Sequence, residues 1–211
     1  EAHRVDAALV LASGFGSRFV PLTYETPKGL LEVFGERMIE RQIRQLHEVG
    51  ITDITIMVGY LKEKFEYLID KYQVKLIYNP EYATKNTLAT MHHAASVLRG
   101  HNCYILSSDN WMRENMYHRY EADAWYAASF MKGETREWAI ETARNGAIRD
   151  VRVGGCDQWC MYGPVYFTKA FSEQFLPFIE SYYRMPGTEQ FYWEDVLIRN
   201  LKLLPPIYIN K

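Results

Sequence analysis

The sequence predicts a single α/β domain of the Rossmann-like type, with a mixed, mostly parallel sheet and helices on both faces. In the first half of the 211-residue chain, short apolar runs alternate with helical patterns, which is typical of parallel strands joined by helical crossovers. The second half is richer in strand patterns and contains an Asn-Gly hairpin signal. Hydrophobic residues make up 48% of the chain, enough for one full core, and no repeat or linker divides it.

The first strand and the loop that follows it organise the chain. Residues 7–12 read AALVLA, a run typical of a strand buried on both faces. The phosphate loop, residues 13–18 (SGFGSR), comes next, and Lys28 lies ten residues after Arg18. Glycines after a buried strand let backbone N–H groups approach an anion, and the two cations add countercharge. The stretch predicts a triphosphate site, and the alternative is an ordinary strand-to-loop turn.

Two better-known phosphate motifs are excluded. A Walker A loop requires a Gly-Lys pair at a fixed spacing that is absent here, and a dinucleotide fingerprint requires a third glycine where this chain has Phe19.

The rest of the first half alternates helix and strand. Apolar residues at helical spacing predict the helices, and short apolar runs predict the strands. Parallel strands bring their carboxyl ends, and so the phosphate loop, to one edge of the sheet. In chain order we expect a helix at 37–49 stopped by Gly50, a strand at 54–58, a helix at 61–72, a strand at 74–78, a helix at 87–98 and a strand at 103–106.

The second half predicts more strand than helix. We expect Pro177 to be tolerated because it falls within the first two turns of its helix. Asn145-Gly146 is the expected hairpin turn. In chain order the expected elements are strands at 124–131, 137–142, 148–153 and 162–167, helices at 172–183 and 194–200, and a strand at 207–209.

Asp109 is a candidate metal ligand. Residues 104–110 read YILSSDN and place this carboxylate just past the end of a predicted strand. Magnesium commonly takes one or two carboxylates together with substrate phosphates. The alternative is a carboxylate that caps the following loop. Its expected position beside the phosphate loop favours the metal role.

Composition limits the class of partner. Net charge is −2, the pI is about 6.4, and no basic block is present, which argues against a nucleic-acid or membrane-surface partner. No apolar run reaches membrane-spanning length. The three cysteines, an odd count, suit a reducing cytoplasm, and we interpret Cys156 and Cys160 as structural.

The second half is also rich in aromatic residues. A quaternary ammonium group cannot donate hydrogen bonds and is held best against aromatic faces. The alternative is that these rings fill the core or the surface.

Several segments resemble a known enzyme family. The patterns at Leu11–Arg18, Pro21–Thr23 and Thr26–Lys28 resemble the signature of nucleotidyltransferases that act on phosphorylated sugars and alcohols. Over its whole length the chain is similar to the bacterial phosphocholine cytidylyltransferases. The further matching segments are Ile56–Leu68, Tyr82–Thr90, the S-S-D-N run, Arg136–Trp138 and Gln190–Asp195.

This resemblance implies an activity. It implies a nucleotidyltransferase domain over residues 1–211, with a nucleotide-binding half in about 1–120 and an acceptor-binding half in about 121–211. The implied reaction transfers CMP from CTP to phosphocholine in the cytoplasm, with Mg²⁺ as cofactor, and yields CDP-choline and pyrophosphate. In this family the enzyme can be fused to a choline kinase, and a chain without an initial methionine fits such a fusion.

The residue patterns indicate the phosphate loop, Arg18, Lys28 and Asp109, and the resemblance implies the remaining residues of the expected site. The catalytic residues are Arg18, Lys28 and Asp109, with Asp109 on the metal. The choline site comprises Trp138, Tyr192 and Glu194. The nucleotide-binding residues are Leu11, Ala12, Ser13, Gly14, Phe15, Gly16, Ser17, Gly59, Tyr60, Asn86 and Thr90.

Two alternatives stay open. The acceptor could be another phospho-alcohol or a sugar 1-phosphate, or the chain could be a nucleotide-binding module without catalysis. Relatives continue past the last strand to a further metal-binding acid, whereas this sequence stops at Lys211. We therefore expect the second metal ligand to lie outside it, and the alternative is that Glu194 or Asp195 takes its place.

Overall fold

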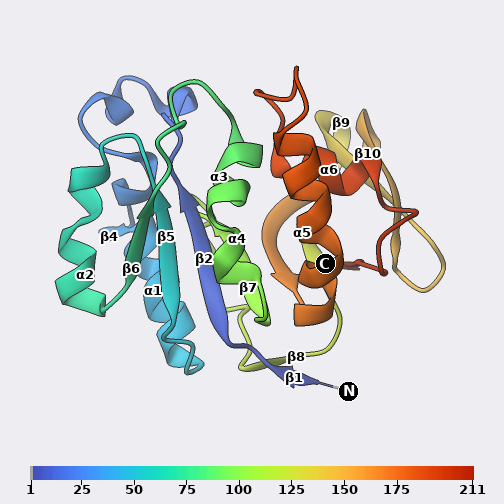
Figure 1. Ribbon diagram of the computed structural model, residues 1–211, viewed down its shortest axis with the longest axis horizontal. Coiled ribbons are helices and arrows are strands. Elements are labelled where there is room, and N and C mark those ends of the chain that lie inside the picture. Colours follow the sequence, from blue (N-terminus) through green and yellow to red (C-terminus); the bar gives the residue numbers. More distant parts are fainter. Residues whose placement is uncertain (1) are drawn as a thin grey trace.

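The computed structural model describes residues 2–211, and its main feature is a seven-stranded sheet (Figure 1). The strand order across this sheet is β11-β9-β10-β7-β2-β5-β6. Two short pairs lie outside it, β1 (His3–Arg4) with β8 (Tyr120–Glu121), and β3 (Glu32–Val33) with β4 (Glu36–Arg37). The sheet strands are β2 (Ala7–Ala12), β5 (Ile54–Val58), β6 (Lys75–Tyr78), β7 (Cys103–Ser107), β9 (Trp125–Thr142), β10 (Ile148–Phe167) and β11 (Tyr208–Asn210).

The strand directions confirm a mixed, mostly parallel sheet. β6, β5, β2 and β7 pair in parallel, β10 runs antiparallel to β7 and β9, and β11 is parallel to β9. Leu11 near the end of β2 pairs with Met57 of β5 and Ser107 of β7. The carboxyl ends of these three strands therefore lie side by side at one edge, as predicted.

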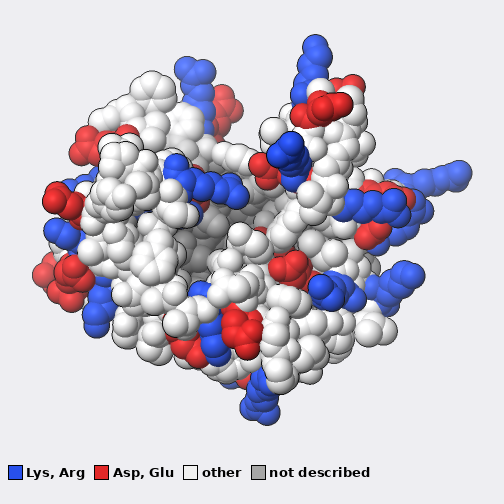
Figure 2. All heavy atoms as spheres, turned by 90° about the horizontal axis from the view of Figure 1, so that it is seen from above, with Lys and Arg blue, Asp and Glu red and all other residues white. Residues whose placement is uncertain are grey.

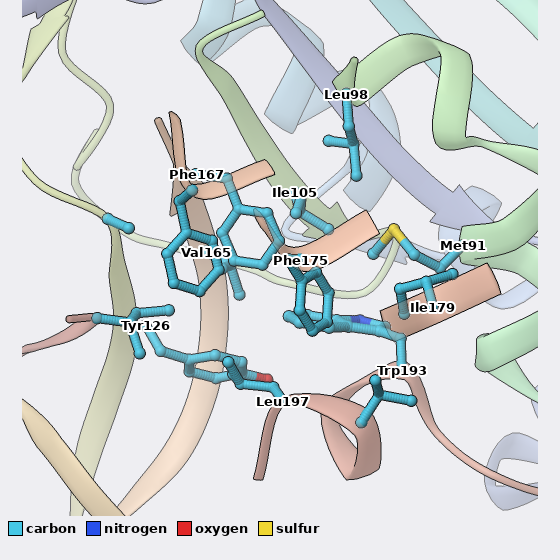
Figure 3. Close-up of a cluster of buried hydrophobic side chains, with 14 of the residues drawn as sticks. Met91, Leu98, Ile105, Tyr126, Val165, Phe167, Phe175, Ile179, Trp193 and Leu197 are labelled. Atoms are coloured by element: carbon cyan, nitrogen blue, oxygen red, sulfur yellow. The ribbon is translucent and has the colours of Figure 1, made fainter. Parts of the chain in front are cut away.

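Helices cover both faces of the sheet, as the sequence predicted (Figure 1). Side chains of β2 alternate between two cores: Leu9 belongs to one and Val10 to the other. Figure 3 shows the first core, in which Phe167, Phe175 and Trp193 pack together. The helices against this core are α3 (Thr87–His93), α4 (Ala95–Leu98), α5 (Lys169–Tyr183) and α6 (Trp193–Arg199), and those against the other are α1 (Met38–Glu48) and α2 (Tyr67–Tyr72).

Two expected helices are interrupted. The helix predicted at 61–72 is a 3₁₀ turn, Lys62–Phe65, followed by α2, and Leu61, with φ 51°, lies just before the turn in a left-handed conformation. The helix predicted at 87–98 divides at Ala94 into α3 and α4. Both pieces keep the same buried spacing, with Met91 in one and Leu98 in the other, so the apolar pattern does not reveal the break. Further 3₁₀ turns are Ser17–Phe19, Leu22–Tyr24 and Lys28–Leu30.

Four expected strands are in fact two long ones. β9 has 18 residues and β10 has 20, and they form a continuous hairpin around the Asn145-Gly146 turn. Register shifts, such as the one between Val153 and Gly155, interrupt the ladder without ending it. The middle of this hairpin is largely exposed, so its sequence lacks the alternation that marks a half-buried strand.

The position of Pro177 within α5 differs from the prediction. Thr168 caps the helix by accepting a hydrogen bond from the Phe171 N–H at 3.0 Å, so α5 begins at Lys169 rather than at residue 172. Pro177 is then its ninth residue, more than two turns inside. Among residues 2–211, no helix is long and apolar enough to cross a membrane.

Candidate active site

A cleft of about 530 Å³ opens at the carboxyl edge of the parallel strands, a volume suited to a nucleotide-sized ligand. Seen from above in Figure 2, this face is hollowed near its middle, and Lys and Arg side chains stand around the hollow. The lining residues are Leu11, Ser13, Gly14, Phe15, Gly16, Ser17, Arg18, Phe19, Lys28, Tyr82, Ala83, Thr84, Lys85, Asn86, Thr87, Ser107, Asp109, Gln190 and Tyr192.

The structure therefore brings eleven of the predicted site residues to one cleft: Leu11, Ser13, Gly14, Phe15, Gly16, Ser17, Arg18, Lys28, Asn86, Asp109 and Tyr192. Six others do not line it: Ala12, Gly59, Tyr60, Thr90, Trp138 and Glu194.

The phosphate loop closes tightly over the Lys28 segment. Gly16 has φ 63°, and a Cβ there would lie 3.1 Å from Thr23 Cγ2 and 3.2 Å from Lys28 Cβ. The Thr23 hydroxyl donates a hydrogen bond to the Gly16 carbonyl at 2.9 Å. Glycine is needed at this position both for the left-handed backbone and for the close approach.

Lys28 and Asp109 meet inside the cleft. Lys28 Nζ lies 3.3 Å from Asp109 Oδ2, and the two side chains are 28% and 29% exposed. The neighbouring Gly29 packs directly on Ser108, because a Cβ on Gly29 would lie only 2.7 Å from Ser108 Cβ. The segment after the phosphate loop is thus in contact with the Asp109 turn, which we define as residues 107–110.

Asp109 fits one part of a magnesium site. Its carboxylate offers hard oxygen atoms to the cleft, and magnesium commonly takes one or two carboxylates and completes its shell with phosphate oxygens and water. Within residues 2–211 no three His, Cys, Asp or Glu side chains cluster as a complete metal site. The residues present fit an ion shared with a bound phosphate.

Gly59, Tyr60 and Thr90 lie behind the loop. A Cβ on Gly59 would lie 2.6 Å from Tyr82 Cβ and 2.8 Å from the Ser13 carbonyl oxygen. The Tyr60 N–H donates to that same carbonyl at 3.1 Å. A hydrogen bond of 3.0 Å joins Thr90 Oγ1 to Ser13 Oγ, and Thr90 is only 2% exposed. These three residues therefore contact the phosphate loop at Ser13 without lining the cleft, and they support the loop.

The segment between β6 and α3 supplies a wall of the cleft that the sequence reading missed except for Asn86. Asn86 caps α3 by accepting a hydrogen bond from the Thr87 N–H at 2.8 Å. Tyr82 packs against Phe15 with ring centroids 5.6 Å apart. No charge or glycine pattern marks this polar segment, and the available signals were its place after a strand end and the family resemblance over Tyr82–Thr90. The lining residues that were not predicted are Phe19, Tyr82, Ala83, Thr84, Lys85, Thr87, Ser107 and Gln190.

Two aromatic rings from distant parts of the second half meet beside the cleft, and of the two only Tyr192 lines it. The rings of Trp138 on β9 and Tyr192, just before α6, lie 5.6 Å apart at 89°. Tyr192 is 42% exposed, and its N–H donates to Asp195 Oδ2 at 2.8 Å, which fixes the start of α6. Two perpendicular faces of this kind can contact a cation from two sides.

Glu194 follows Tyr192 by two residues and is partly buried. The Tyr126 hydroxyl donates to Glu194 Oε2 at 3.3 Å. Burial raises the pKa of Glu194 to about 7, although the Tyr126 hydrogen bond acts in the opposite direction.

Comparisons with known proteins agree with this geometry. Residues 7–137 match the family described as Nucleotidyl transferase. Choline-phosphate cytidylyltransferase of Streptococcus pneumoniae is 32% identical over 97% of this chain and 88% of its own length. The 2-aminoethylphosphonate cytidylyltransferase of Lancefieldella rimae is 34% identical over 90% of this chain and 78% of its own.

A solved structure agrees as well. The CTP:phosphocholine cytidylyltransferase from Streptococcus pneumoniae superimposes with a TM-score of 0.92 and 32% identity, covering 99% of this chain and 90% of that one. The two chains therefore share their architecture over almost their whole lengths.

Proposed function

The chain belongs to the nucleotidyl transferase family, and we propose that it transfers CMP from CTP to phosphocholine, yielding CDP-choline and pyrophosphate. The observation that carries the proposal is the composition of one cleft. The phosphate loop, Lys28 and Asp109 line one part of it, and Tyr192 of the perpendicular ring pair lines another. A triphosphate and a phosphorylated cation can thus bind side by side in one cleft.

The chemical step is an in-line displacement. A phosphate oxygen of phosphocholine attacks the α-phosphorus of CTP, and the bond from that phosphorus to the pyrophosphate oxygen breaks. The attacking oxygen is already ionised at neutral pH, so no side chain has to remove a proton. The contribution of the protein is to align the two phosphates and to stabilise the charge that develops.

Three side chains would provide most of this stabilisation. Arg18 and Lys28 would bind the triphosphate and offset the charge on the departing pyrophosphate. Asp109, with phosphate oxygens and water, would hold Mg²⁺, which screens the negative charges of the two substrates. Lys28 contacts Asp109 at 3.3 Å, and we expect this pair to separate when a triphosphate binds the lysine and a cation binds the carboxylate.

The acceptor would bind with its trimethylammonium group against Trp138 and Tyr192. Cation–π attraction of this kind is worth up to about 2 kcal/mol per desolvated ring. The ionised form of Glu194 would add countercharge nearby. We place the reaction in the cytoplasm, because all three cysteines are free thiols and thiols persist in reducing compartments.

A second candidate acceptor is 2-aminoethylphosphonate. A relative with 34% identity over 90% of this chain carries that activity in its name. A primary ammonium group requires hydrogen-bond acceptors, whereas a quaternary one requires aromatic faces. The ring pair at 5.6 Å favours the quaternary group, and Glu194 is the acceptor that a primary amine would use.

An acceptor screen tests the proposal. Pyrophosphate release is measured with CTP, UTP or dTTP, each paired with phosphocholine, phosphoethanolamine, 2-aminoethylphosphonate or glucose 1-phosphate. We expect the highest kcat/KM with CTP and phosphocholine. A higher value with 2-aminoethylphosphonate would make that compound the substrate, and CTP binding without turnover of any acceptor would identify a nucleotide-binding module.

A further inference from the structure

A side chain of α1 forms hydrogen bonds to the backbone of the Asp109 turn. Gln42 is 1% exposed, and its amide nitrogen donates two hydrogen bonds, to the Ser107 carbonyl at 2.8 Å and to the Asn110 carbonyl at 2.9 Å. These carbonyls lie at the two ends of the turn, on either side of Asp109. One buried amide group therefore joins both ends of the segment that carries the carboxylate.

Besides Gln42, the turn is supported by the packing of Gly29 on Ser108 and by three hydrogen bonds. The Asn110 N–H donates to the Ser107 carbonyl at 3.0 Å, and the Ser107 N–H donates to Asn110 Oδ1 at 2.8 Å. The Ser108 N–H donates to the Leu11 carbonyl at 3.0 Å, which joins the turn to the end of β2 just before the phosphate loop. The position of the Asp109 carboxylate thus depends on a small hydrogen-bonded unit.

Loss of the Gln42 amide would remove the side-chain donor from the Asn110 carbonyl, whereas the Ser107 carbonyl would still accept from the Asn110 N–H. Asn110 is only 8% exposed, and a buried acceptor without a donor costs about 1–3 kcal/mol. The turn can lower that cost by rotating the Asn110 carbonyl toward water, which moves the neighbouring carboxylate. Magnesium is sensitive to such movement because it demands near-ideal octahedral geometry.

We propose that Gln42 is a positioning residue that sets the Asp109 carboxylate for cation binding in the cleft. The proposal rests on the proposed function for its kinetic consequences. The placement of the turn itself can be measured without turnover.

The same helix provides a matched control. Gln45 follows one turn later, is 2% exposed, and donates to the Met112 carbonyl at 3.2 Å. In both glutamines the side-chain oxygen is buried without a hydrogen-bond partner. Gln42→Met and Gln45→Met therefore remove the same amide from the same helix, but only the first removes it from the Asp109 turn.

The experiment compares the two variants in four measurements: thermal melting, kcat and KM for CTP, Mn²⁺ binding in the presence of CTP by electron paramagnetic resonance, and amide hydrogen exchange over residues 107–110. For Gln42→Met we expect kcat to fall about 10- to 100-fold, Mn²⁺ affinity to fall about 10-fold, and exchange of the Ser107 and Asn110 amides to accelerate. Its KM for CTP should change less than about threefold. Gln45→Met should keep the other values near those of the wild type, and its melting temperature should fall no further than that of Gln42→Met, because Arg41 Nε still donates to the Met112 carbonyl at 2.9 Å.

Equal effects of the two variants on kcat, Mn²⁺ affinity and exchange would overturn the proposal and make Gln42 a structural residue. If Gln42→Met does not fold, Gln42→Glu and Gln45→Glu replace the pair, because buried glutamic acid keeps the shape and, when protonated, one donor. We then expect the same contrast with smaller factors. If the wild type binds Mn²⁺ and CTP but turns over no acceptor, the proposed function fails, while the Mn²⁺ and exchange measurements still decide the role of Gln42.

Discussion

Lys28 and Asp109 form an ion pair at 3.3 Å, and each side chain is more than a quarter exposed. Partly hydrated pairs of this kind contribute only about 0–1 kcal/mol. The pair is therefore too weak to matter for stability and weak enough to open when ligands arrive. A triphosphate can compete for the lysine while a cation competes for the carboxylate.

The first prediction follows for Asp109→Asn. The variant should fold normally, because the site is not a stabilising one, but kcat should fall about 100-fold or more since a hard-cation ligand has lost its charge. Steady-state kinetics with Mg²⁺ and a melting curve test this. Asp123→Asn, at an exposed position outside the cleft lining, is the control. Near wild-type turnover by Asp109→Asn would reduce the residue to a loop cap.

Lys28→Ala tests the other member of the pair. The lysine charge faces phosphate both before and during reaction, so we expect KM for CTP to rise and kcat to fall, each by about 10-fold. Lys64→Ala, an exposed lysine outside the cleft lining, should leave both values unchanged. Wild-type kinetics in Lys28→Ala would assign this side chain to the solvated surface.

Glu194 predicts a pH dependence of stability. Its pKa is raised from 4.5 to about 7 by burial, so between these pH values the folded protein holds a proton that the unfolded chain has released. Stability therefore falls as pH rises through this window. Glu194→Gln, which stays neutral, should gain on the order of 1–2 kcal/mol relative to wild type between pH 5 and pH 8. Melting curves at both pH values measure the difference, and parallel pH profiles would contradict it.

Prediction from sequence worked best for residues whose chemistry is local. Gly14, Gly16, Arg18, Lys28 and Asp109 were found because phosphate and metal chemistry requires those residue types near strand ends, and all five line the cleft. Gln42 was missed because a buried glutamine on an amphipathic helix carries no local signal. Its role depends on a turn 65 residues away in the chain.

At the scale of elements, a sequence pattern records burial rather than hydrogen bonding. β2 and β5 have the bounds that their apolar runs predicted. The break at Ala94 was invisible because the buried spacing continues through it. The exposed middle of the β9–β10 hairpin looked like loop because no core faces it. Where a strand is held only by backbone hydrogen bonds to its neighbour and buries no side chains, its sequence gives no sign that it continues, and one long strand is predicted as two.

The proline inside α5 yields an element-scale prediction. Pro177 is exposed, has no N–H to donate to the Glu173 carbonyl, and lies more than two turns inside the helix. Pro177→Ala should restore that bond and stabilise the protein by about 1–3 kcal/mol, raising Tm by several degrees. Thermal melting measures the effect. An unchanged or lowered Tm would show that the helix has adapted fully to the proline.

For the whole molecule, the cleft depends on contacts between the two halves of the chain. The Asn86 N–H donates to the Glu189 carbonyl at 2.9 Å, and the Trp193 N–H donates to Thr87 Oγ1 at 3.0 Å. These bonds seat the start of α6, and with it Tyr192, against the start of α3. The fold class was predictable from local patterns, whereas this long-range seating was not, because no periodicity encodes which loops touch.

The last prediction concerns the two substrates, which we expect to bind at different parts of this cleft. Trp138 and Tyr192 lie on the acceptor side, so Trp138→Leu or Tyr192→Leu should weaken phosphocholine use and leave KM for CTP nearly unchanged. The expected loss is about 1–3 kcal/mol, or roughly 5- to 150-fold in kcat/KM for the acceptor. Tyr192→Phe should cost much less, because the ring face rather than the hydroxyl attracts the cation.

Trp159→Leu provides the control for these variants. Trp159 lies on the same hairpin and packs against Phe130 rather than against Tyr192. If the ring pair served only the core, Trp138→Leu would lower Tm and impair CTP and phosphocholine use together, as a general loss of packing does. A well-folded Trp138→Leu, Tyr192→Leu double variant with normal phosphocholine kinetics would rule out the aromatic site. Steady-state kinetics for both substrates, with a melting curve for each variant, separate these outcomes.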